Sequence, residues 1–80
     1  MTGTNLYNSV LRSRVSSYTR EQVAEILNCS KMNVDHICIH GRTDYTGQRR
    51  VYLSKDSRGK ISQDNLLQYI QGIHGIAVTA

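Results

Sequence analysis

The 80-residue chain contains no proline, no tryptophan and no phenylalanine. Without proline, no periodic segment has to end or kink because of a missing backbone N–H group. Five tyrosines are the only aromatic residues, so they and the aliphatic side chains must build the whole core. A chain of this length forms one small domain with a single hydrophobic cluster.

Long apolar runs and cysteine pairs are also scarce. No apolar run approaches the ~20 residues that a membrane-spanning helix needs, and no charged and then apolar leader begins the chain. The two cysteines, Cys29 and Cys38, are typical of reduced thiols rather than of a disulfide framework. We therefore expect a soluble, cytoplasmic protein.

Acidic residues are few, and the excess of positive charge is concentrated in one segment. The chain has 10 Lys and Arg against 6 Asp and Glu, a net charge of +4. Within residues 42–60, six cations stand against two carboxylates, which also gives +4. The six are Arg42, Arg49, Arg50, Lys55, Arg58 and Lys60. Such clustering favours an anionic partner, with nucleic acid the first candidate. A solvated loop with incidental charge is the alternative.

The two ends of the chain predict an extension and a tail. Residues 1–17 form a helical extension, with a helix over residues 5–15 that ends at two serines. One side of that helix carries Leu6, Tyr7, Val10, Leu11 and Val15. Residues 72–80 form an apolar tail. The tail either packs against the N-terminal helix or offers a sticky surface to another copy or a partner protein.

Two helices with a very short connection occupy the middle of the chain. The first begins after Thr19, which forms a capping box with Gln22, and ends at Asn28, a residue that tolerates the left-handed conformation. The second begins after Ser30 and ends at Gly41. The inward residues are Val23, Ala24, Ile26 and Leu27, then Val34, Ile37 and Cys38. The short connection forces a steep crossing, which leaves the polar side of the second helix facing outward.

A strand, a turn and a return strand follow in the basic segment. In residues 49–54, Val51 and Leu53 alternate with polar or aromatic residues, which predicts a half-buried strand. The turn-rich stretch "SKDSRG" comes next, and Lys60 and Ile61 begin the return strand. The predicted hairpin is therefore basic at its tip and on its outer face.

A last helix is predicted after Ser62, with Asp64 in its first turn and Gly72 at its end. Its buried stripe contains Leu66, Leu67 and Ile70. Together these segments predict an α+β fold of three to four short helices with a two-stranded hairpin.

Residues 20–41 resemble the helix-turn-helix of the MerR-like and excisionase-like winged-helix proteins. Ala24 is the small residue where the second helix approaches, Asn28 stands where the family usually has Gly, and Cys29 takes the small turn position before Ser30. Downstream, "RRVYLSKDSRGKISQDNLLQYI" is similar to the wing hairpin and closing helix of the family. The likeness covers roughly residues 18–71.

The resemblance implies that residues 1–80 form one winged helix-turn-helix domain that binds double-stranded DNA sequence-specifically. The recognition helix would enter the major groove, while the basic wing would follow the backbone or enter the minor groove. The resemblance implies no enzymatic activity and no cofactor.

An architectural role is also implied by this resemblance. Excisionase-like proteins bind repeated sites, bend DNA and bias a phage-type integrase toward excision, and many also repress transcription. The partners would be DNA, an integrase and further copies of the protein, in a bacterial or phage-infected cell. A plain transcriptional regulator is one alternative, and a protein-interaction module that turns its basic wing to an acidic partner is another.

The candidate DNA contacts are Arg20, Lys31, Met32, Asn33, Asp35, His36, Arg42, Arg49, Arg50, Lys55, Arg58 and Lys60. Lys31 suits guanine or phosphate, Asn33 suits adenine, and His36 suits a base edge or phosphate. Met32 either touches a thymine methyl group or fills space beside the wing. Asp35 would repel phosphate unless it accepts from cytosine or orients a neighbouring cation. The other cations suit phosphates or the minor groove, and an ordinary solvated side chain is the alternative for each.

Metal binding and catalysis have weaker support in the sequence. His36 and His40 are four residues apart, with Cys38 between them and Cys29 nearby, a spacing that occurs in zinc sites. However, His36 and Cys38 belong to different faces of a helix, and no CxxC motif occurs. There are no paired acids near a nucleophile and no glycine-rich phosphate loop. We expect neither a metal centre nor a catalytic site.

Overall fold

Four helices and four short strands occupy residues 3–75, the part of the chain that the computed structural model describes. They are α1 (Gly3–Arg12), β1 (Ser17–Tyr18), α2 (Arg20–Leu27), α3 (Lys31–His40), β2 (Arg42–Thr43), β3 (Arg50–Val51), β4 (Ile61–Ser62) and α4 (Gln63–His74). The protein is thus a small α+β structure with four helices and a two-stranded antiparallel hairpin, β2–β3, among these residues.

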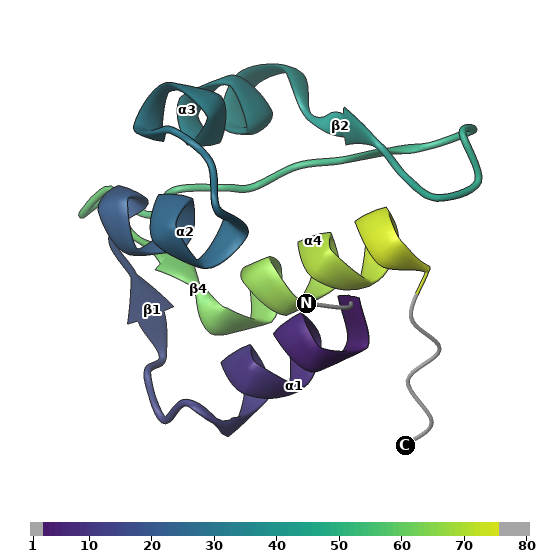
Figure 1. Cartoon of the computed structure of the whole chain (residues 1–80). Helices are drawn as coiled ribbons and strands as arrows, with labels where there is room; N and C mark the ends of the chain where they lie inside the picture. Colours follow the sequence, from purple (N-terminus) through teal and green to yellow (C-terminus); the bar gives the residue numbers. More distant parts are fainter. Residues whose placement is uncertain (1–2, 76–80) are drawn as a thin grey trace.

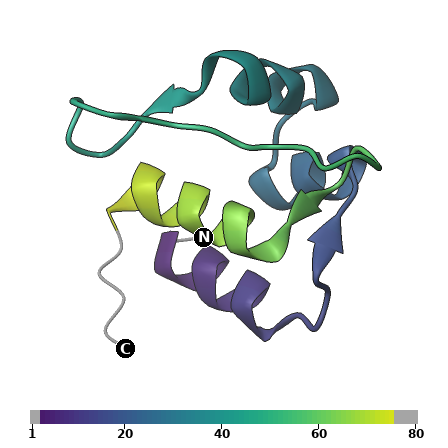
Figure 2. The ribbon, with the colours of Figure 1, turned by 180° about the vertical axis from the view of Figure 1, so that it is seen from behind.

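The helix α4 lies at the centre, with α1 packed along one side (Figure 1). On the other side lie α2 and the extended segment that follows β3. The helix α3 and the β2–β3 hairpin sit together on the side farthest from α1, as the reverse view also shows (Figure 2). A second antiparallel pair, β1 with β4, joins the start of α2 to the start of α4.

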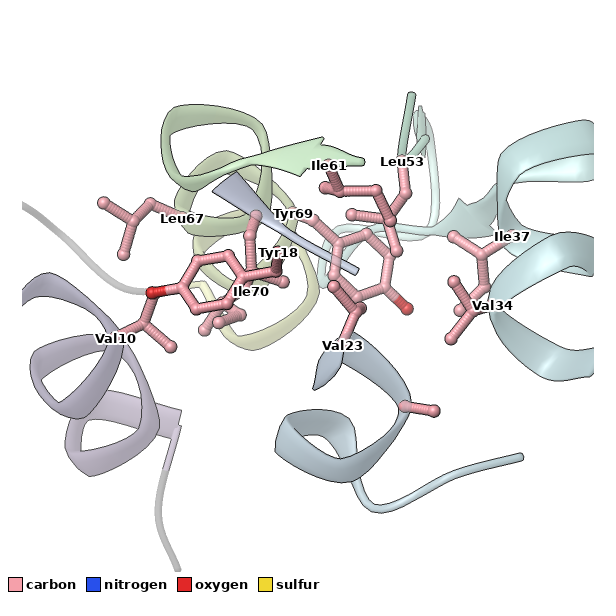
Figure 3. Packing of buried hydrophobic residues seen from close by; sticks show 12 residues of the cluster. Val10, Tyr18, Val23, Val34, Ile37, Leu53, Ile61, Leu67, Tyr69 and Ile70 are labelled. Carbon is pink, nitrogen blue, oxygen red and sulfur yellow. The ribbon is translucent and has the colours of Figure 1, made fainter. Parts of the chain in front are cut away.

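All four helices contribute to a single hydrophobic core (Figure 3). The buried side chains are Val10, Tyr18, Val23, Ala24, Val34, Ile37, Leu53, Ile61, Leu66, Leu67, Tyr69 and Ile70. Two of the five tyrosines, Tyr18 and Tyr69, supply the aromatic bulk for which other proteins use Phe or Trp. The hydroxyl of Tyr18 hydrogen-bonds to the Ser13 hydroxyl, so its polar end is not buried without a partner.

The predicted helix caps are confirmed. The Gln22 amide N–H donates to Thr19 Oγ1 over 3.1 Å, and the Thr19 N–H donates to Gln22 Oε1 over 2.9 Å. Asn28 ends α2 with φ of 56°, in the left-handed region. The hydroxyls of Ser30 and Ser62 accept the third N–H group of α3 and α4, respectively. Local side-chain chemistry therefore sets the start of each of these helices.

The first helix ends earlier than predicted, and part of its predicted stripe is wrong. Leu11 and Val15 are exposed. The physical reason is a long-range contact, because the Gln63 side-chain amide donates to the carbonyls of Val10 (2.7 Å) and Ser13 (3.0 Å). These two bonds hold the end of α1 and the turn after it against the start of α4, before the chain enters β1.

The predicted strand pairing is also wrong. β3 pairs with β2. The return strand was predicted to begin with Lys60 and Ile61, but Ile61 belongs to β4, which pairs with β1. A single bridge between Lys55 and Ile61 joins the two segments that the sequence predicted as partners. The reason lies at Gly41, whose φ of 72° turns the chain so that Arg42–Thr43 runs back beside β3.

The predicted end of the last helix is wrong as well, since α4 continues through Gly72 to a left-handed cap at Gly75. A Cβ atom at Gly72 would lie 2.6 Å from Val51 Cγ1, so a glycine here lets β3 approach the helix closely. The Tyr45 N–H donates to the Gly72 carbonyl over 2.9 Å and ties the hairpin loop to α4. Residues 76–80 of the predicted tail lie outside the described residues.

Candidate nucleic-acid interface

A polar hollow of about 470 Å³ separates α3 from the β2–β3 hairpin. Its lining comes from Asn33, His36, Ile37, Gly41, Arg42, Thr43 and Arg50. Four of the sequence-predicted contact residues, Asn33, His36, Arg42 and Arg50, therefore meet in one place. We call this hollow the hairpin groove.

Two contacts place the hairpin against α3. A Cβ atom at Gly41 would lie 2.8 Å from the Val51 carbonyl oxygen, so the turn after α3 packs directly on the β3 backbone. The Arg50 guanidinium donates from Nη1 to the carbonyl of His40 over 3.0 Å, at the end of α3 where a cation complements the helix dipole. These two contacts fix the position of the hairpin relative to α3, and with it the shape of the hairpin groove.

Arg42 lies close to the buried Tyr69 as well as to the hairpin groove. Burial raises the pKa of the Tyr69 hydroxyl, and the adjacent Arg42 guanidinium offsets part of this rise. The Arg42 side chain is exposed and lines the hairpin groove, where it can meet a ligand.

A second basic hollow, of about 300 Å³, lies where the start of α2 meets the loop after β3. It is lined by Thr19, Arg20, Glu21, Lys55, Arg58, Gly59 and Lys60. We call it the loop hollow. Four more predicted contact residues, Arg20, Lys55, Arg58 and Lys60, meet here. Lys31 lies close to this group, since its Nζ atom is 3.9 Å from Glu21 Oε1.

Asp35 connects α3 to the loop hollow. Its two carboxylate oxygens accept from Arg20 Nη1 over 2.7 Å and from Lys55 Nζ over 2.6 Å. The hydrogen bond from Lys55 is the largest cause that lowers the pKa of Asp35, and the charges of both cations add to it. Of the roles open to this residue, the structure supports orientation of neighbouring cations.

The two hollows lie on different sides of α3. Asn33 and His36 line the hairpin groove, whereas Asp35 holds the cations of the loop hollow. Successive residues of an α-helix are turned by about 100°, so Asp35 and His36 diverge across the outward face of α3. Cations therefore flank this helix on both sides.

No family model, curated protein or solved structure matches this chain. Within residues 3–75, no three side chains of His, Cys, Asp or Glu gather in a group that could hold a metal ion. None of the helices in that range has the length and apolarity to cross a bilayer. The two hollows and the helix between them are the features of the molecule that point to a function.

Four predicted contact residues line neither hollow, namely Lys31, Met32, Asp35 and Arg49. Six residues that line a hollow were not predicted as contacts, namely Thr19, Glu21, Ile37, Gly41, Thr43 and Gly59. Met32 is 80% exposed on α3, so the alternative in which it fills space beside the hairpin is wrong. Arg49 is exposed in the loop between β2 and β3. Thr43 and Gly41 line the hairpin groove, and no local pattern marks them, because the pairing of β2 with β3 brings them there.

Each basic loop is shaped by one aspartate. Asp44 Oδ1 accepts from the Thr46 N–H and hydroxyl and from the Arg49 N–H. Asp56 Oδ1 accepts from the N–H groups of Arg58 (2.8 Å) and Lys60 (3.0 Å). Each carboxylate thereby replaces the missing backbone partners of its loop and presents arginine at the surface.

These aspartates predict a loss of stability in acid. The Thr46 hydroxyl is the largest cause that lowers the pKa of Asp44 below 3.8, and the Lys60 N–H is the largest for Asp56. Since the folded pKa values are depressed, the stabilisation is complete above the unfolded value. It is lost as pH falls from about 5 towards 2. Urea unfolding at a series of pH values measures this decline.

The double variant Asp44→Asn, Asp56→Asn keeps a carbonyl acceptor in each loop but removes the titrating charge. We expect its stability to fall less steeply over the same acid range. Parallel pH curves for variant and wild type would contradict this origin of the acid sensitivity.

Proposed function

We propose that this protein is a winged helix-turn-helix DNA-binding protein, with α3 as its recognition helix and the β2–β3 hairpin as its wing. The observation that carries the proposal is the placement of cation-lined hollows on both sides of α3. An α-helix with side chains is about 10–12 Å across and fits the major groove, which is about 12 Å wide. The phosphates of both groove edges would then face the cations on both sides.

The available cations support binding to the DNA backbone. Asp35 already partners Arg20 and Lys55, while Arg49, Arg58 and Lys60 make no ion pair within 4.0 Å among the described residues. Backbone contacts fix the register of a protein on DNA, and groups such as Asn33 in the hairpin groove read base edges. No enzymatic step and no cofactor belong to this proposal.

The biological role that we propose is architectural, as in the excisionase-like proteins, with or without transcriptional repression. It would involve several copies on repeated sites and an integrase as the protein partner. An excision assay in vitro with and without the protein separates this role from that of a plain transcriptional regulator.

The salt dependence of duplex binding tests DNA binding itself. Contact with about four to six phosphates predicts that log Kd against log salt concentration has a slope of magnitude about 4 to 5. Fluorescence anisotropy with a labelled duplex measures it. A flat response would refute the proposal and favour a protein partner.

Asn33→Ala is expected to relax sequence preference. Loss of a bidentate contact to adenine would weaken binding to the preferred duplex by about 1–3 kcal/mol and leave a scrambled duplex almost unaffected. Titrations on both duplexes measure the difference. Asn8→Ala, an exposed change on α1, is the matched control. Equal losses on the two duplexes would mean that α3 does not read bases.

Asp35→Asn is expected to tighten nonspecific binding while it lowers the specificity ratio. The neutral amide forms no ion pair with Arg20 or Lys55, so these two cations become available for up to two further phosphates. Arg20 keeps only its 4.0 Å approach to Glu21. The slope of the salt plot should then steepen by as much as about 1.8. Asp64→Asn on α4 makes the same charge change away from α3 and is the control. An unchanged slope would mean that these cations reach phosphate even when held by Asp35.

A further inference from the structure

The outward face of α3 carries two large apolar side chains that the fold leaves in solvent. Met32 is 80% exposed and Ile39 is 70% exposed. They are seven residues apart, which puts them on the same side of the helix, about 10 Å apart along its axis. We call this pair the apolar ridge.

Cations lie on both sides of the apolar ridge. On one side, Asp35 holds Arg20 and Lys55 at 2.7 and 2.6 Å. On the other side, the hairpin groove contains Arg42 and Arg50. A ligand for this face must therefore offer apolar groups along a line between two rows of negative charge.

We infer that the apolar ridge binds the methyl groups of two thymines on the floor of the major groove, about three base pairs apart. The spacing follows from the distance between the two side chains and the rise of the duplex. This inference rests on the proposed function. DNA meets the requirement of the ridge because phosphates line both edges of the groove and thymine methyl groups lie between them.

The chemistry of the ridge also favours thymine over the other pyrimidine at these positions. Cytosine presents an N–H donor to the major groove where thymine presents an oxygen and a methyl group. Cytosine also lacks the C5 methyl group, so at that position neither Met32 nor Ile39 would find an apolar partner. The ridge thus selects by contact with methyl groups, while Asn33 reads base edges by hydrogen bonding.

Replacing thymine by uracil removes the methyl group and changes nothing else in the base pair, which makes it the direct test. A preferred duplex is first selected from a randomised pool with the 80-residue chain. We expect the selected duplex to contain two thymines about three base pairs apart. Replacing either by uracil should weaken binding about fourfold, which is the effect of removing one buried methyl group.

Variants assign each thymine to its side chain. Met32→Ala should abolish the discrimination between thymine and uracil at one position, and Ile39→Ala should abolish it at the other. Leu11→Ala removes a comparable exposed side chain on α1 and should leave both effects unchanged.

Three outcomes would overturn the inference. If uracil duplexes bind as tightly as thymine duplexes while the steep salt dependence persists, DNA binding stands and the thymine contacts do not exist. If no duplex binds with a salt-dependent affinity, both proposals fail. If sedimentation shows a dimer that the Met32→Ser, Ile39→Ser variant dissociates, the ridge belongs to a second copy of the chain.

Discussion

Replacing Arg49 and Arg58 together by glutamine is expected to weaken binding to every duplex by about 60-fold at 0.1 M salt. Each phosphate contact contributes a slope of about 0.9 to the salt plot, hence about eightfold in affinity between 1 M and 0.1 M salt. The two arginines occupy different loops, and each loop is shaped by its own aspartate through backbone N–H groups. Their side chains can therefore be changed while the loops keep their hydrogen bonds.

The measurement is duplex affinity at several salt concentrations, on specific and scrambled sequences. The slope should decrease in magnitude by about 1.8, and both duplexes should lose affinity alike. Arg12→Gln with Arg14→Gln is the matched control, because it lowers the net charge by the same amount. Arg12 is the last residue of α1 and Arg14 follows two residues later. The helix α1 lies on the side of the molecule opposite α3 (Figure 1). A similar loss in the control would mean that net charge, not the two basic loops, drives binding.

Gly41→Ala is expected to be the most destabilising single change in the hairpin, with a loss of about 3 kcal/mol in the free energy of unfolding. Gly41 has φ of 72° and ψ of −175°, a region that only glycine occupies at low cost. An added Cβ atom would also lie 2.8 Å from the Val51 carbonyl oxygen and from the Tyr52 ring. The β3 backbone cannot yield without loss of its pairing with β2.

Thermal unfolding followed by circular dichroism should show a decrease of about 10–20 °C in Tm. Gly47→Ala is the control, since Gly47 also has a positive φ, of 76°, but its added Cβ would meet nothing within 4 Å. We expect about 1 kcal/mol for that change. If the two variants are equally stable, the close approach of the α3–β2 turn to β3 contributes nothing measurable. The duplex affinity of Gly41→Ala, measured at a temperature where the variant is folded, shows whether the substitution also changes the hairpin groove.

Several features of the fold could be predicted because they depend on neighbours in the sequence. The capping box of Thr19 and Gln22, the left-handed Asn28 and the serine caps of α3 and α4 are all confirmed. The inward positions Val34 and Ile37 are buried as predicted, because residues three apart lie on the same side of a helix.

The errors concern contacts between distant segments. The hairpin partner of β3, the end of α1 and the passage of α4 through Gly72 depend on long-range contacts. These are the turn at Gly41, the bonds from Gln63, and the approach of Val51. Gly41 and Gly72 are recognisable in the sequence as glycines, but no neighbouring residue indicates which distant segment approaches them.

The candidate site divides in the same way. The segment that carries most of the charge and the helix that faces outward are already visible in the order of residue types, because charge and periodicity are local properties. Which cations meet, and which carboxylate holds them, is decided only when α2, α3 and the loop after β3 come together around Asp35. The exposure of Ile39 beside Met32 is likewise a result of tertiary packing, because the core accepts only one side of α3.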